Sequence, residues 1–112
     1  MKIDPRRFIG KGFTRRKTFP DSVDDYCIWI DGIKVGRIMK VPRAGNNMVW
    51  FWSLHGPYFP GPKSPDGEEE TYEAARDAFK AKFWEWHVWA MKRETMAAWE
   101  GAEHDTARRL YS

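Results

Sequence analysis

The chain has only one cysteine and no long apolar run, and both shortages narrow what it can be. Cys27 has no second cysteine to pair with, which excludes an intramolecular disulfide. No stretch approaches the roughly 20 apolar residues that a membrane-spanning helix needs. The first residues, MKIDPRRFIG, also lack the apolar core of a secretion signal. These features predict a cytoplasmic protein without stable membrane insertion.

Acidic residues are scarce at the amino terminus. Asp4 is the only acid among residues 1–17, which carry seven lysines and arginines. The net charge of the whole chain is +3, so the rest of the chain is net acidic. Prolines and glycines interrupt this segment. We predict an irregular basic arm over 1–22 that can contact phosphate or another anionic surface.

Tryptophan, by contrast, is abundant. The chain has seven tryptophans in 112 residues. Because a buried indole removes about 200 Å² of surface from water, a few such rings can form most of the core of a small domain. We expect a single folded domain over 23–112 after the basic arm.

Two β-rich runs on either side of Asp31-Gly32 predict a tight hairpin. A type I′ turn needs positive φ at both central residues, which Asp tolerates and Gly adopts freely. This turn sets Ile30 opposite Ile33, and the alternation then predicts two faces. The core face is expected to be Tyr26, Ile28, Ile30, Ile33, Val35 and Met39. The outer face is expected to be Cys27, Trp29, Lys34, Gly36, Ile38 and Lys40.

The remaining segments complete a predicted α+β fold. We expect strands over about 24–30, 33–40 and 48–55, a proline-rich loop over 56–66 and a helix over about 68–100. On the third strand, the core face is assigned to Met48, Trp50, Trp52 and Leu54. The expected architecture is a three-stranded antiparallel β-meander packed on one long carboxy-terminal α-helix, followed by a short tail.

One face of the expected helix is predicted to pack on the sheet, because its apolar residues lie within about 60° of one direction. These residues are Ala75, Phe79, Phe83, Trp86, Ala90 and Ala97.

The second half of the helix is apolar on every side. In the stretch KFWEWHVWAM, each residue turns by about 100°, so the three tryptophans point in different directions. A helix that extends past its sheet needs another cover there. The sequence leaves four covers open: a second copy, the chain's own ends, a different protein and a membrane interface. The candidate interface residues are Trp84, Val88, Trp89, Met91, Met96 and Trp99.

Residues able to carry out chemistry do not form a recognisable site. The three histidines show no i, i+4 pair and no cysteine at metal-ligand spacing. Cys27 and His55 could form a nucleophile and base, but a lone strand cysteine is typically a packing residue. We therefore predict that the protein is not an enzyme, with no catalytic residue, metal, cofactor or small-molecule substrate.

Basic residues recur along the second predicted strand, and the predicted outer face of the sheet adds an aromatic ring, Trp29, as the stacking surfaces of nucleic-acid-binding proteins require. In element order over about 23–95, the chain resembles the methyl-CpG-binding domains and a plant family of DNA-binding domains. That resemblance implies a sheet that enters the major groove. The candidate nucleic-acid contacts are Arg6, Arg7, Lys11, Arg15, Arg16, Lys17, Lys34, Arg37, Lys40 and Arg43. The stretch GIKVGRI, followed by WFW and a tryptophan-rich helix, is also similar to short bacterial proteins and implies no activity.

The sequence predicts a non-catalytic interaction or regulatory module that self-associates through the aromatic end of its helix. Its partner would be a second copy or another protein. The alternative is a nucleic-acid-binding module that uses the basic arm and the outer face of the sheet. The two functions differ in salt dependence, because phosphate contacts weaken steeply with salt whereas an apolar interface is nearly indifferent to it.

Overall fold

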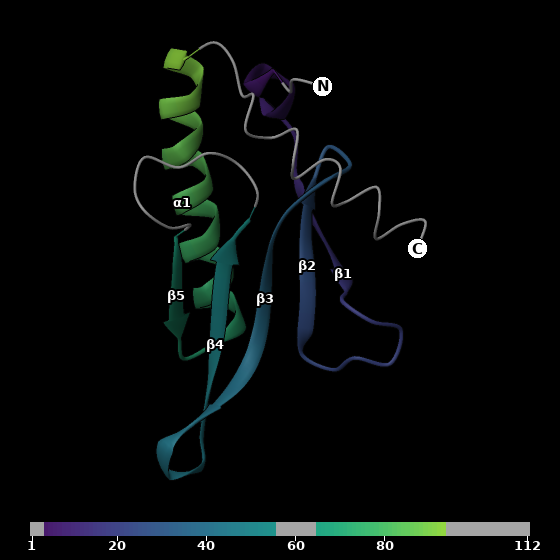
Figure 1. Cartoon of the computed structure of the whole chain (residues 1–112), viewed down its shortest axis with the longest axis vertical. Coiled ribbons are helices and arrows are strands. Elements are labelled where there is room, and N and C mark those ends of the chain that lie inside the picture. The colour runs from purple at the N-terminus through teal and green to yellow at the C-terminus, as the bar shows by residue number, and fades with distance from the viewer. Residues whose placement is uncertain (1–3, 56–64, 94–112) are drawn as a thin grey trace.

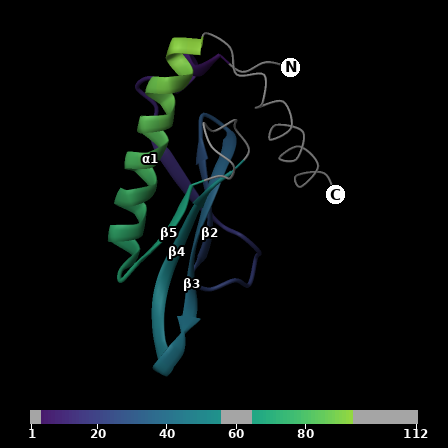
Figure 2. The same cartoon turned by 60° about the vertical axis from the view of Figure 1, so that its left-hand side comes forward.

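The computed structural model describes residues 4–55 and 65–93, which form two layers, an antiparallel sheet and one helix (Figures 1 and 2). The strands follow the order β1-β2-β3-β4-β5 across the sheet. The predicted α+β class is confirmed, but the sheet has five strands rather than three. The elements are η1 (Pro5–Phe8), β1 (Phe13–Lys17), β2 (Asp25–Ile30), β3 (Ile33–Arg43), η2 (Ala44–Asn46), β4 (Asn47–Leu54), β5 (Asp66–Glu69) and α1 (Tyr72–Arg93).

Strand β1 lies inside the segment that the sequence predicts to be an irregular arm. It pairs antiparallel with β2, with Phe13 opposite Ile30 and Lys17 opposite Tyr26. The sequence of β1, FTRRK, has one apolar residue and therefore no hydrophobic alternation. Charged residues of this kind are typical of an edge strand. The prediction of an irregular segment is wrong here because edge strands need little apolar surface.

Strand β5 corrects the predicted start of the helix. Its residues, DGEE, span the predicted boundary between the proline-rich loop and the helix, yet they pair with β4. The helix begins later, and the Oγ1 of Thr71 caps it by accepting a hydrogen bond of 3.1 Å from the amide of Ala74. Gly67 allows β5 to pass close to the indole of Trp52, where a Cβ would lie 2.8 Å from the ring. The predicted helix residues 94–100 lie outside the described residues.

The hairpin between β2 and β3 has the predicted turn but only half of the predicted register. Asp31 and Gly32 both have positive φ, 51° and 75°, as a type I′ turn requires. A β-bulge then shifts the pairing, so that Ile28 lies opposite Gly36 rather than Val35. This slip of one residue exchanges the two faces of β3 beyond the bulge.

The bulge corrects the predicted positions of several β3 side chains. Ile38, expected on the outer face, is completely buried in the core. Met39, expected in the core, lies on the outer face opposite Phe51. Ile38 therefore does not lie beside Trp29 on the outer face, where the sequence places it. Gly36 and Lys40 likewise change sides with Ile38.

The hydrophobic core lies between α1 and one face of the sheet. The predicted core face of β4 is confirmed, because Trp52 and Leu54 are buried there and Trp50 packs against the core. Only Met48, the second residue of β4, is exposed, at 46%. The helix runs along β3, β4 and β5, whereas β1 and β2 lie to its side (Figure 1). Phe13 bridges that space by packing on Phe79.

Candidate interaction sites

Residues of the amino-terminal segment cover part of the aromatic end of α1. The ring of Phe8, completely buried, meets Phe83 edge-on with ring centroids 5.6 Å apart. The Nε2 of His87 donates a hydrogen bond of 2.8 Å to the carbonyl oxygen of Pro5. These contacts hold η1 against the helix. Of the four covers that the sequence leaves open, the chain's own end thus accounts for this part of the surface.

Trp86 and Trp84, two of the tryptophans of α1, differ in how deeply they are buried. Trp86 is buried at 4% exposure. Trp84 is half-buried, and its ring centroid lies 5.8 Å from that of Phe13 and 4.9 Å from that of Phe83. Both rings therefore contact residues of the same chain.

The described remainder of the predicted protein interface is a narrow strip. Val88 is 58% exposed, and Trp89 and Met91 beside it are half-buried. Met96 and Trp99, which the sequence also places in this interface, lie outside the described residues. We call Val88, Trp89 and Met91 the helix strip.

Half of the predicted nucleic-acid contacts are paired with carboxylates. Lys34 is only 7% exposed and lies on the outer face of the sheet. The hydrogen bond from Arg7 lowers the pKa of Asp31, the acid that Lys11 also approaches. The five cations in ion pairs are held by acids of the same chain rather than forming an open basic surface. The ion pairs are Arg6–Asp4, Arg7–Asp31, Lys11–Asp31, Arg37–Asp25 and Arg43–Glu68.

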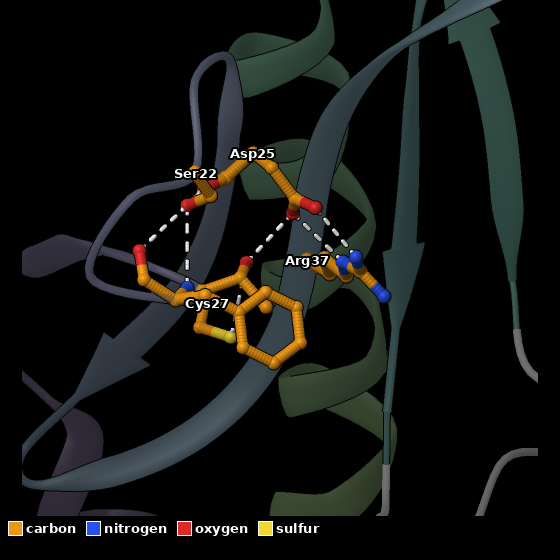
Figure 3. A network of polar contacts seen from close by, with 6 residues as sticks. Ser22, Asp25, Cys27 and Arg37 are labelled. Atoms are coloured by element: carbon orange, nitrogen blue, oxygen red, sulfur yellow. Dashed lines mark hydrogen bonds and ion pairs between the residues drawn. The ribbon is translucent and has the colours of Figure 1, made fainter.

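Asp25 is the centre of a polar network on the outer face (Figure 3). Its carboxylate accepts hydrogen bonds from Arg37 Nε at 2.8 Å and Nη2 at 2.5 Å, and from Thr18 Oγ1 at 2.6 Å. The bonds from Arg37, more than that from Thr18, lower the pKa of Asp25. The Sγ of Cys27 lies 3.6 Å from Thr18 Oγ1. The network joins the β1–β2 loop to β2 and β3.

Cys27 and His55, the possible nucleophile and base, lie on β2 and at the end of β4, so that β3 separates them. The nearest polar partner of His55 is Ser53, whose Oγ lies 2.8 Å from Nε2. Burial, and secondarily the charge of Arg37, lowers the pKa of His55. Within residues 4–55 and 65–93, no group of three or more His, Cys, Asp or Glu side chains is placed to hold a metal ion.

The cations of β1 differ from the paired arginines elsewhere. The guanidinium carbon of Arg15 lies 4.3 Å from the ring centroid of Tyr26, and that of Arg16 lies 4.8 Å from the ring centroid of Trp29. Arg15, Arg16 and Lys17 form no ion pair with any described carboxylate. A hydrogen bond to Tyr72, and to a lesser degree the charge of Glu73, raises the pKa of Arg15. The other edges of the two stacked guanidinium groups keep N–H donors available for a carboxylate or phosphate.

The main chain of β1 is also open on one side, because β1 is an edge strand of the described sheet. The amide of Thr18 donates to the carbonyl oxygen of Asp25 at 3.1 Å. Hydrogen-bonded and non-hydrogen-bonded residue pairs alternate along an antiparallel ladder. The N–H and C=O groups of Arg15 and Lys17 therefore face away from β2. The sequence identified these cations as candidates. The open strand edge on which they lie could be recognised only from the order of the strands in the sheet.

The fold and its surfaces define a two-layer α+β domain with a cationic edge strand. No protein-family model matches the chain, and comparison with curated proteins and with solved structures found no match either. No helix in the described residues is long and apolar enough to cross a membrane.

Proposed function

We propose that the protein is a small non-catalytic interaction module that binds an acidic, extended segment of a partner protein along β1. The observation that carries this proposal is the presence of three consecutive cations without carboxylate partners in the described residues on an open strand edge. An added strand would form main-chain hydrogen bonds with Arg15 and Lys17. Its acidic side chains would pair with Arg15 on one face and Arg16 on the other.

A second copy is a poorer occupant of this edge. Two β1 strands related by a two-fold axis would place arginine and lysine side chains opposite one another. Like charges directly opposite in neighbouring strands are destabilising. Charge complementarity therefore favours an acidic segment of a different protein.

Nucleic acid is also a poorer occupant, because its affinity grows with the number of phosphates that cations neutralise. Of the ten cations that the sequence suggests, five are in ion pairs and Lys34 is buried. The remaining cations are Arg15, Arg16, Lys17 and Lys40. Four cations support only a weak and steeply salt-dependent interaction with phosphate.

An acidic peptide is expected to bind wild-type protein through its main chain. A suitable probe is a fluorescent peptide of about ten residues that alternates glutamate with valine. We expect a dissociation constant of about 50 µM, because so small an interface binds weakly. Lys17→Pro removes an outward N–H without removing a bond to β2, and should weaken binding about tenfold. Fluorescence anisotropy measures the affinity.

Lys17→Gln is the matched control, since it removes the same charge and keeps the amide. It should weaken binding by no more than about threefold, as expected for one exposed ion pair. Equal affinity of the two variants, with unchanged circular dichroism, would contradict strand addition. Tighter binding of a single-stranded or duplex oligonucleotide than of the peptide would assign β1 to nucleic acid instead.

Self-association through the helix strip is a second candidate function, favoured by the 58% exposure of Val88. An exposed valine between half-buried apolar neighbours is a suitable centre for a small apolar contact. We expect sedimentation velocity to show a concentration-dependent dimer. Val88→Glu should weaken this dimer at least about tenfold, because a buried unpaired charge is costly.

The matched control is Ala81→Glu, at an exposed position nearer the start of the same helix. It adds the same charge outside the helix strip and should leave the dimer unchanged. A protein that stays monomeric at every concentration would exclude this second function. A dimer that tolerates Val88→Glu would exclude the helix strip as its interface.

A further inference from the structure

The two edges of the described sheet carry opposite charges (Figure 1). At one edge β1, with the sequence FTRRK, is cationic, and at the other edge β5, with the sequence DGEE, is acidic. Charged side chains on an edge strand are a common means of keeping the sheets of neighbouring molecules apart. Edges of opposite charge attract instead, so this protection does not act between β1 and β5.

The main chain of β5 is open on the side away from β4. The amide of Leu54 donates to the carbonyl oxygen of Pro65 at 3.0 Å. Because hydrogen-bonded and non-hydrogen-bonded pairs alternate along the ladder, the N–H and C=O groups of Asp66 and Glu68 face away from β4. β5 therefore presents outward main-chain groups at alternate residues, as β1 does along its own edge.

We propose that β5 of one copy adds to β1 of a second copy, so that the protein assembles head to tail when no acidic partner occupies β1. The register that sets both outward cations opposite acids places Arg15 against Glu68 and Lys17 against Asp66. Each pair would exchange main-chain hydrogen bonds in both directions and add an attraction between opposite charges. This inference rests on the proposed function, because it uses the same open edge of β1 and makes the acidic partner a competitor of self-assembly.

The faces of the two strands agree with this pairing. Neighbouring strands are antiparallel throughout the sheet, so β1 and β5 run in the same direction within one copy. Antiparallel pairing of β1 with β5 therefore turns every second copy over and places its helix on the opposite face. The outward cations of β1 lie on its helix-facing side, in register with Ile28 of the core. The outward acids of β5 lie opposite Ser53 and Phe51 on the outer face, so turning one copy over brings the opposite charges to the same side.

Lys17 and Asp66 are the pair that contributes most to this contact. Both side chains are exposed, and neither forms an ion pair with a described residue. The pair of Arg15 and Glu68 contributes less, because each of these side chains already has a polar contact within its own copy. Lys17 and Asp66 are therefore the residues to vary.

The wild-type protein should form a series of species that continues beyond the dimer. The two edges are different surfaces, and a contact between different surfaces that does not close into a ring extends into a linear assembly. We expect a dissociation constant of about 100 µM for each contact, because so small an interface binds weakly. Sedimentation velocity between about 20 µM and about 1 mM covers this value. Association through the helix strip would instead end at a dimer.

Exchange of the two charges tests the contact directly. Lys17→Glu and Asp66→Lys each place like charges opposite one another between copies of the same variant, and each should weaken association at least about fivefold. In an equimolar mixture, β1 of the first variant meets β5 of the second with opposite charges, and the reverse contact is that of the wild type. The mixture should therefore associate within about twofold of the wild type.

Lys40→Glu is the matched control for charge reversal. Lys40 is exposed on the interior strand β3 and forms no ion pair within the described residues, so its reversal should leave association unchanged. Circular dichroism verifies that every variant is folded.

Glu68→Pro separates this inference from the proposed function. It removes an outward N–H of β5 without removing a bond to β4, and should weaken self-association at least about tenfold. The acidic peptide should still bind β1 of this variant as it binds the wild type, because β1 is unchanged. An excess of that peptide should also return assembled wild-type protein to the monomer.

Three results would overturn the proposal. The first is a wild-type protein that stays monomeric or stops at a dimer; if it still binds the acidic peptide, the proposed function stands without this inference. The second is a mixture of the two folded charge variants that associates no better than either variant alone. The third is an assembly that persists in Glu68→Pro or in an excess of the acidic peptide, which would place the contact away from β5 or β1.

Discussion

Replacement of Phe83 by alanine is expected to lower the free energy of unfolding by about 4 kcal/mol. The side chain is completely buried, so the substitution removes a whole ring and leaves a cavity. A domain of this size has a stability of about 5–15 kcal/mol, so this loss is a large fraction of the total. The ring neighbours that lose contact are Phe8, Phe13, Trp84, Trp86 and His87.

Urea denaturation followed by circular dichroism measures this loss. Val88→Ala is the matched control, because it shortens an exposed apolar side chain on the same helix and should change stability by no more than about 0.5 kcal/mol. A loss below about 1.5 kcal/mol for Phe83→Ala would contradict the packing of η1, β1 and α1 around one ring.

Gly36→Ala is expected to destabilise the protein by about 3 kcal/mol, an unusually large effect for one methyl group. An alanine Cβ would lie 2.2 Å from Phe79 Cε2 and 2.3 Å from the carbonyl oxygen of Ser53. The second contact is with the main chain of β4, which cannot move without disturbing the sheet. Thermal or urea unfolding measures the change.

Gly36→Ala also distinguishes the observed pairing register of β2 and β3 from the register that the Asp31-Gly32 turn alone predicts. Without the bulge, Gly36 would lie on the outer face, and its methyl group would not meet Phe79. The control is Gly12→Ala, since no atom lies within 4 Å of an added Cβ there and the stability should change by no more than about 0.5 kcal/mol. Equal stability of the two variants would contradict the bulged pairing of β2 and β3.

Strong local signals in the sequence predicted their elements correctly. Asp31-Gly32 specifies a turn with positive φ at both residues, and the backbone there has it. On β4 both faces are apolar in the sequence, so alternation did not separate them, and the burial of Trp52 and Leu54 in the structure settles the face. The period of Ala75, Phe79 and Phe83 identifies the buried face of α1.

Elements without a local apolar pattern were missed. β1 and β5 are short, charged edge strands, and each is held by pairing with a distant segment that local patterns do not reveal. The interaction surfaces were not predicted in full for the same reason. The sequence groups all of these basic residues as candidates, and only the tertiary structure separates the paired arginines from Arg15 and Arg16.

The sequence by itself determined the α+β class, the turn at Asp31-Gly32 and the buried face of α1, because each depends on residues that are close in the chain. The tertiary structure decided the register of β3 beyond Val35, since the bulge allows Ile38 rather than Met39 to fill the core. It also decided that Trp84 packs against Phe13. The physical reason is that packing and strand pairing join residues distant in sequence, and the choice among them depends on the volume and charge available where they meet.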